Sequence, residues 1–263
     1  PMDRRKFIKR TGAAAAGLFA APYILPSGRL FAASGAQLAE HVVFVMFAGG
    51  VRQQESVLQR YLADGLLRDH DGPVLVEREV DHGVRRGLLL ELDLEHYDFS
   101  RDSTSLIRPT EGTIVERLAP RIAVRREAAL ELPHILVLID DPAGTVIEPL
   151  AAERDALTRL YHSPLMLGGR HISGYAVDAE RAARAVRALQ ALGQPQASAA
   201  RYGVPADTPP MLFAIGDGNH SLATAKALWE QVKAEVGLDH PSRYALVEVE
   251  NIHDPALAFE PIH

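Results

Sequence analysis

The residues best suited to chemistry lie at positions 216–221, where the sequence is Gly-Asp-Gly-Asn-His-Ser. An apolar run precedes them and a helical pattern follows, so these residues are expected at a strand-to-helix junction. The start of a helix presents free backbone N–H groups and a partial positive charge, which suit a phosphate or carboxylate. The junction is therefore predicted to bind a small anionic molecule or a nucleotide.

Each residue of the junction has a role in this interpretation. Asp217 would act as a base or hold a metal ion, and His220 would carry a proton or contact the anion. Gly218 lets the backbone approach a ligand closely, and Asn219 and Ser221 lie at the helix start. In the alternative interpretation, Asp217 or Asn219 caps the helix and the glycines only form the turn. The position at the end of a strand, where α/β proteins bind ligands, favours the functional role.

Two further segments carry predicted ligand-binding residues. Arg108 can form two hydrogen bonds with one carboxylate or phosphate group, and Thr110 and Glu111 follow it closely. His171 follows the glycines at 168–169 and is expected to contact the anion as well. The alternatives are a turn with a surface salt bridge for the first segment and a plain hairpin for the second.

Asp140 and Asp141 end the apolar run of residues 134–139. Paired carboxylates at a strand end can hold Mg²⁺ through one or two oxygens, and the expected cofactor is Mg²⁺ with a nucleotide. The alternative is an ordinary Asp-Pro turn. No two histidines have the spacing of a helical zinc motif, and the absence of cysteine excludes disulfides, thiolate metal sites and cysteine nucleophiles.

Net charge limits the expected partners. The 263 residues carry a formal charge of −6, and residues 1–36 hold six Lys/Arg and one Asp, so the remaining chain carries −11. A body this acidic has no overall basic surface for nucleic acid. A stable membrane span is not expected either, because Pro22 and Pro26 interrupt the apolar stretch near the N-terminus. The sequence leaves the oligomeric state open.

Residues 1–36 resemble a twin-arginine export leader. Arg4 and Arg5 precede an alanine-rich stretch, and small residues at 33–36 fit a cleavage site. The protein is expected to be exported to the periplasm if this leader is used, and otherwise to be cytoplasmic. The alternative is a basic amphipathic helix.

The expected elements favour an α+β or mixed α/β fold, with a mixed sheet, hairpins and flanking helices. Residues 72–94 have the pattern of two strands joined at 81–83, and residues 178–193 that of a strong helix capped by Asp178. Residues 148–161 are also predicted to be helical, whereas the Pro-rich residues 194–210 are interpreted as a link.

Residues 37–58 are expected to form a strand–helix lead-in, and their pattern resembles the first strand of exported alkaline-phosphatase-like proteins. Those proteins have an acidic metal ligand where this chain has Ala48-Gly49-Gly50. The departure weakens the hydrolase interpretation that the resemblance suggests.

From about residue 59 to residue 263, ordered blocks of sequence resemble the bacterial domain-of-unknown-function 1015 (DUF1015) family. The blocks include SLIRPTEGTIVER, HILVLIDDPAGT, LMLGGRHISGY, LFAIGDGNHSLATAKALWE and RYALVEVENIHDPALAFEPIH. Family members usually continue past the last block, so this domain is expected to be C-terminally incomplete. The Asp-Gly-x-His pattern is also similar to that of ParB-like and free-serine-kinase-like nucleotide-binding domains, which have arginine where this chain has Ser221.

Together the residues and the resemblance predict a nucleotide- or phosphometabolite-dependent small-molecule enzyme of a phosphotransferase-like kind. Asp217 and His220 would be its catalytic residues. A non-catalytic ligand-binding or regulatory domain is the first alternative, and an exported alkaline-phosphatase-like hydrolase is the second.

Overall fold

The computed structural model describes residues 23–24, 29–33, 64, 67–127, 135–165 and 168–258. The predicted leader (1–36) lies outside these residues except for two short strands, and the lead-in (37–58) lies wholly outside them. A small antiparallel sheet consists of β1 (Tyr23–Ile24), β2 (Arg29–Ala33) and β3 (Leu67–Asp71).

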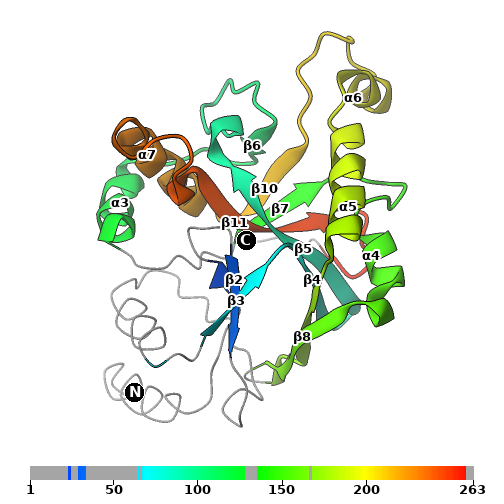
Figure 1. Ribbon diagram of the computed structural model, residues 1–263. Helices are drawn as coiled ribbons and strands as arrows, with labels where there is room; N and C mark the ends of the chain where they lie inside the picture. Colours follow the sequence, from blue (N-terminus) through cyan, green and yellow to red (C-terminus); the bar gives the residue numbers. More distant parts are fainter. Residues whose placement is uncertain are drawn as a thin grey trace, which may run out of the picture.

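The main sheet has eight strands, which lie in the spatial order β6-β10-β7-β11-β5-β4-β9-β8 (Figure 1). The pairs β6/β10 and β7/β11 are parallel and the other neighbours are antiparallel. This mixed sheet with hairpins confirms the predicted fold class. Its strands are β4 (Val74–Val80), β5 (Gly83–Asp93), β6 (Ile107–Pro109), β7 (Leu136–Ile139), β8 (Thr158–Pro164), β9 (His171–Ala176), β10 (Phe213–Asp217) and β11 (Tyr244–Asn251).

Helices α4, α5 and α7 pack on one face of this sheet and form the main core with it (Figure 1). Alternate residues of the strands, such as Val137 and Val249, point into this core with Leu189 of α5 and Trp229 of α7. The described α-helices are α3 (Leu118–Glu127), α4 (Glu148–Ala152), α5 (Ala179–Leu192), α6 (Pro195–Tyr202) and α7 (Asn219–Val236), and the short 3₁₀ helices are η1 (Leu94–His96), η2 (Val115–Arg117), η3 (Arg154–Ala156) and η5 (Pro241–Arg243).

Helix α5 begins where the sequence predicts, because the Asp178 carboxylate accepts a hydrogen bond from the Arg181 N–H at 2.9 Å. The predicted helix over residues 148–161 is wrong beyond its first part. Helix α4 ends at Ala152, and strand β8 begins at Thr158 because it pairs with β9 along the sheet edge. No helix in the described part of the chain has the length and apolar character needed to cross a membrane.

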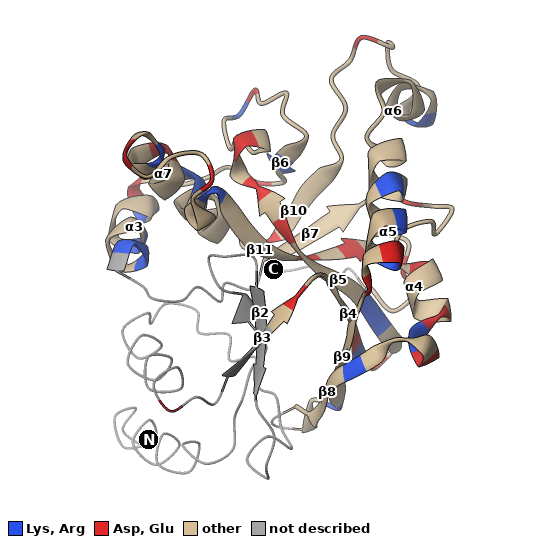
Figure 2. Cartoon of the chain, in the orientation of Figure 1, with Lys and Arg blue, Asp and Glu red and all other residues tan. Residues whose placement is uncertain are grey.

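The second face of the sheet mixes an apolar cluster with charged side chains. The cluster includes Val76, Leu89 and Tyr161. Beside it, the Arg85 Nε lies 2.7 Å from the Glu250 carboxylate, and Glu250 has no exposed surface. Charged residues on the strands are visible in Figure 2. Since a buried charge is stable only when it is paired, Glu250 is tolerated on this face because Arg85 lies beside it.

Glu91, on β5, makes the free energy of unfolding depend on pH. Burial raises the pKa of this carboxyl from 4.5 to about 7. The folded state therefore binds the proton more tightly than the unfolded state, and stability falls as pH rises from 4.5 to 7. The full shift corresponds to about 3 kcal/mol, and solvent screening of this half-buried group reduces it to about 1–2 kcal/mol. We expect Glu91→Gln to stabilise the protein by that amount at pH 8, as measured by urea unfolding.

At pH 4.5 and below, the same substitution should have little effect, because Glu91 is protonated in the folded state. Glu116→Gln, at an exposed position of η2, is the matched control and should not change the pH profile. An unchanged pH profile in Glu91→Gln would contradict the assignment.

Candidate functional site

The predicted strand-to-helix junction is present, and its helix starts without a side-chain cap. Strand β10 ends at Asp217, and α7 begins at Asn219. Gly218, between them, has a left-handed backbone (φ 85°), and no side chain hydrogen-bonds to the first-turn N–H groups of α7. The Asp217 carboxylate instead accepts the Gly218 N–H at 2.7 Å. The interpretation in which Asp217 or Asn219 caps the helix is therefore wrong.

Asn219 lies at this helix start with an unusual environment. The residue is 3% exposed, and its side-chain oxygen is buried without a hydrogen-bond partner among the described residues. Leaving such an atom unpaired costs about 1–3 kcal/mol. The first turn of α7 also contains no acidic residue that would offset its positive charge. The helix start thus combines uncapped N–H groups with a buried side-chain oxygen that has no partner among the described residues.

The segment after β6 lies beside this junction, as the prediction for Thr110 and Glu111 requires. Because β6 runs parallel to β10, both strands end at the same edge of the sheet. The Thr110 hydroxyl donates to the Ile215 carbonyl at 2.6 Å. The Ile114 N–H donates to Nε2 of His220 at 3.3 Å. Because Nε2 of His220 accepts this hydrogen bond, Nδ1 is the ring nitrogen that remains for a ligand.

Arg108 does not reach this junction with its guanidinium group. Its Nε donates to the Ser105 carbonyl at 2.7 Å, and its Nη2 donates to the carbonyls of Pro209 and Pro210 at 3.1 and 3.0 Å. Those prolines precede β10, whereas Asp217 ends it. Burial lowers the pKa of Arg108 below its usual value. These hydrogen bonds attach β6 to the segment that connects α6 with β10.

His171 also lies away from the junction. It begins β9, which is separated from β10 by four strands of the sheet. At about 4.8 Å per strand spacing, the two strands are about 24 Å apart. His171 instead stacks on His162 in a separate cavity.

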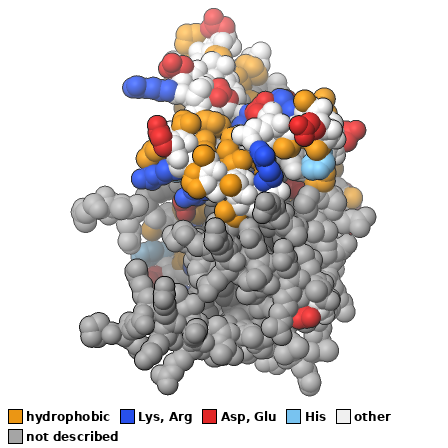
Figure 3. Space-filling view, turned by 90° about the vertical axis from the view of Figure 1, so that its left-hand side faces the viewer, with side chains coloured by type: hydrophobic (Ala, Val, Ile, Leu, Met, Phe, Trp, Pro, Cys, Tyr) orange, Lys and Arg blue, Asp and Glu red, His pale blue; other side chains and the backbone are white. Residues whose placement is uncertain are grey.

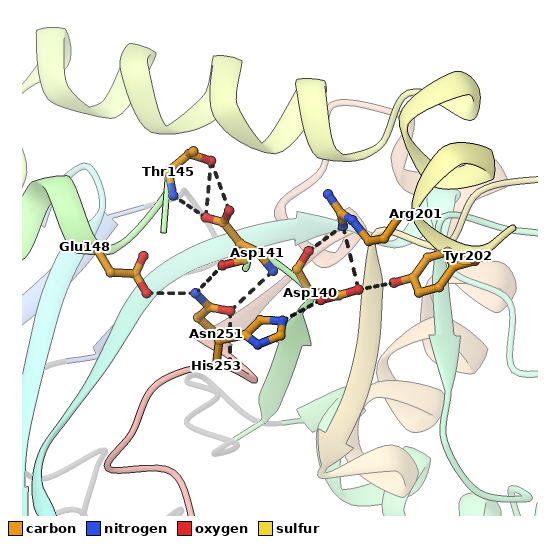
Figure 4. Close-up of polar contacts among 8 residues, drawn as sticks. All are labelled: Asp140, Asp141, Thr145, Glu148, Arg201, Tyr202, Asn251 and His253. Carbon is orange, nitrogen blue, oxygen red and sulfur yellow. Dashed lines mark hydrogen bonds and ion pairs between the residues drawn. The ribbon is translucent and has the colours of Figure 1, made fainter. Parts of the chain in front are cut away.

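Asp140 and Asp141 lie at the opposite end of the strands from Asp217, on the other side of the sheet along the strand direction. Strand β7, which they follow, is antiparallel to β10, and Asp217 pairs with Leu136 at the start of β7. In Figure 4 the Asp140 carboxylate accepts hydrogen bonds from the Tyr202 hydroxyl at 2.6 Å and from Nε2 of His253 at 2.7 Å. Burial raises the pKa of Asp140, but these hydrogen bonds and the nearby Arg201 outweigh it and hold the pKa below its usual value.

Asp141 closes the turn that leads into α4. It has no exposed surface, and its carboxylate accepts hydrogen bonds from the N–H groups of Thr145 and Val146 at 2.5 and 2.9 Å. The Asn251 amide donates to the Asp141 carbonyl at 2.8 Å and to Glu148 Oε1 at 2.7 Å (Figure 4). These contacts agree with the Asp-Pro turn interpretation. A magnesium role for this pair stays a prediction, and no group of three or more metal-ligating side chains occurs in the described part of the chain.

Sequence reasoning missed two polar groups. Asn251, the last residue of β11, and His253, just after it, belong to the network of Asp140 and Asp141 because β11 runs parallel to β7. His162 lines the same cavity as His171, and it directly follows the segment predicted to be helical (148–161). A regular strand would place Arg159 and His162 on opposite faces, and they share a face only because the register shifts between Arg159 and Tyr161.

The fold and the junction define an α+β protein with an uncapped helix start at the edge of a mixed sheet. The family model described as "Protein of unknown function (DUF1015)" matches residues 50–263. The chain therefore belongs to the DUF1015 family. No curated protein and no solved structure matches the chain.

Proposed function

We propose that this chain is a nucleotide- or phosphometabolite-dependent small-molecule enzyme of a phosphotransferase-like kind, with its site at the start of α7. The observation that carries the proposal is the uncapped first turn of an 18-residue helix, next to the buried, unpartnered oxygen of Asn219. Free N–H groups at a helix start suit a phosphate group. The Asn219 oxygen accepts a hydrogen bond from a hydroxyl or amino group of the ligand.

The remaining residues of the junction have roles that follow from their geometry. The exposed Asp217 carboxylate serves as a base or as a ligand to Mg²⁺ that arrives with the nucleotide. Nδ1–H of His220 donates to the transferred phosphate, since Nε2 is held by Ile114. Thr110 and Glu111 form the rim of the site, whereas Arg108 and His171 take no part in it.

The rim also has an apolar component. Ile114 and Val115 are 42% and 62% exposed and lie in the segment that contacts His220. Apolar side chains are interspersed with charged ones on the side of the molecule that carries α3 and α7 (Figure 3). The non-phosphate part of the substrate, a base or a carbon chain, would pack on these two residues.

Ser221→Asp tests the anion site, because it should change stability and binding in opposite directions. A carboxylate in the first turn of α7 favours the helix by about 0.3–1 kcal/mol but repels a bound phosphate. The wild type should be stabilised by about 2.7 kcal/mol at a concentration of MgATP, MgADP or inorganic phosphate near 100 times Kd, as thermal shift would measure. Ser221→Asp should slightly raise the melting temperature of the free protein and lose this ligand-induced increase.

Turnover separates the enzyme from a non-catalytic binding domain. With MgATP and a set of small hydroxyl and amino compounds, ³¹P NMR should show consumption of ATP by the wild type. We expect Asp217→Asn to slow it by at least about a hundredfold. Asp207→Asn, at an exposed position before β10, is the matched control and should remain active. Binding without consumption would support the non-catalytic alternative, and full activity of Asp217→Asn would contradict the proposed site.

A further inference from the structure

A cavity of about 490 Å³ opens at the other side of the sheet from the junction, beside β4, β8 and β9. This volume lies in the range of small-molecule sites, about 300–1,000 Å³. Residues of the three strands and of η3 line it. The cavity shares no lining residue with the junction at α7, so the inference below does not depend on the proposed function.

The polar floor of the cavity is buried and ordered by its own contacts. Glu77 and Ser173 are each 8% exposed. The Arg154 guanidinium contacts Glu77 at 3.3 Å and Asp155 at 2.9 Å. Nδ1 of His162 lies 2.8 Å from the Ser173 hydroxyl. A buried polar floor in a pocket of this size suits a polar ligand better than an apolar one.

Two histidines that line the cavity stack on each other and leave one nitrogen each for a ligand. The rings of His162 and His171 are parallel within 2°, with centroids 4.9 Å apart. Nδ1 of His171 lies 3.4 Å from Glu79 Oε2, while Nδ1 of His162 is taken by Ser173. Nε2 of each ring therefore remains for hydrogen bonding to a bound molecule.

Charged side chains of both signs line the cavity. Two arginines and three carboxylates give a formal charge of −1 when the histidines are neutral. Arg154 is already paired with Glu77 and Asp155, which leaves Arg159 and Glu79 as the groups best placed to recognise charge. Within the described residues, Arg159 has no ion pair, and the one side-chain contact given for Glu79 is the 3.4 Å approach to His171.

Arg159 and Glu79 lie toward opposite ends of the cavity. Arg159 pairs with Tyr175 on β9, whereas Glu79 contacts His171 at the other end of that strand. Four residues of a strand span about 13 Å. The cavity thus offers a cation near one end and a carboxylate near the other.

We propose that this cavity binds a short zwitterionic peptide of about three residues, with its carboxylate at Arg159 and its ammonium group at Glu79. The peptide is neutral overall, so the net charge of the cavity does not oppose it. A free α-amino acid has its two charges too close together to reach both groups. The Nε2 atoms of the stacked histidines hydrogen-bond to the peptide groups between the two ends.

Isothermal titration with glycine peptides tests this assignment on the full chain. Triglycine should bind, and glycine, N-acetyl-triglycine and triglycinamide should each bind at least about tenfold more weakly, since each lacks the spacing or one charge. Arg159→Gln and Glu79→Gln should each weaken triglycine binding by a similar factor. The matched controls Arg187→Gln and Glu180→Gln, at exposed positions of α5, should bind triglycine like the wild type.

The modified peptides also identify which part of the assignment would fail. Equal binding of triglycine and its acetylated form would overturn the role of Glu79, and equal binding of the amide would overturn that of Arg159. Absence of triglycine binding by a folded wild-type protein would overturn the whole inference. If the protein binds phosphate through Arg159 but does not bind triglycine, the ligand of the cavity would be an anion and not a zwitterion.

Discussion

Replacing Trp229 with alanine is expected to lower the free energy of unfolding by about 3–5 kcal/mol. Trp229 has no exposed surface and belongs to the main core with Leu94 and Tyr97. Its indole N–H also donates to Glu95 Oε1, so the residue anchors α7 to η1. The substitution removes the packing and the hydrogen bond together. Urea unfolding at neutral pH measures the change.

A Trp229→Phe variant separates the two contributions. It keeps most of the ring and loses the N–H donor, so we expect a smaller loss of about 1–3 kcal/mol. The hydrogen bond from Trp229 also holds the pKa of Glu95 below its usual value, with help from Lys233, and the phenylalanine variant should raise that pKa. Lys233→Gln is the surface control and should change stability by less than about 1 kcal/mol. A loss below about 1 kcal/mol in Trp229→Ala would show that α7 is anchored elsewhere.

The elements with strong local signals could be predicted from the sequence. The hairpin at residues 81–83 joins β4 and β5, and Asp178 caps α5. Both signals depend on residues close together in the chain, such as turn residues and capping groups. Local chemistry therefore sets these elements with little help from tertiary contacts.

Other elements depend on tertiary packing and were missed. Helix α6 lies in the Pro-rich link, where Pro195 is tolerated because it occupies the first turn. Strand β8 lies in a segment with good helix formers, and its pairing with β9 overrides their propensity. A single sequence does not show which strand a segment will pair with.

The same limit explains how much of the candidate site could be predicted. Asp217, Gly218, Asn219, His220 and Ser221 are consecutive, so their common location follows from one strand-to-helix junction. Whether a distant segment joins them depends on the order of strands in the sheet. The order places β6 beside β10, which brings Thr110 close, but it places β9 far away with His171. The direction of the Arg108 side chain likewise depends on the carbonyls that it meets after folding.

The last prediction concerns Gly174, at the centre of β9, where the second face of the sheet depends on close packing. A Cβ atom added there would lie 2.1 Å from Cε1 and 2.2 Å from Cζ of Tyr161. Tyr161 is 7% exposed and belongs to the apolar cluster of this face, so its ring has little room to move. We expect Gly174→Ala to destabilise the protein by about 1–3 kcal/mol or more, because the ring or the strand must shift.

A double-mutant cycle assigns that cost to the contact with the ring. Tyr161→Ala alone should cost about 3–5 kcal/mol through lost packing. The double variant Gly174→Ala/Tyr161→Ala should be more stable than the sum of the two losses by about 1–3 kcal/mol, because the added methyl group then has space. Tyr161→Phe is the matched control, since it keeps the ring and should leave the full cost of Gly174→Ala in place. Strict additivity with Tyr161→Ala would mean that the cost arises from the β9 backbone, and the glycine would then be required for a reason other than the ring that crosses it.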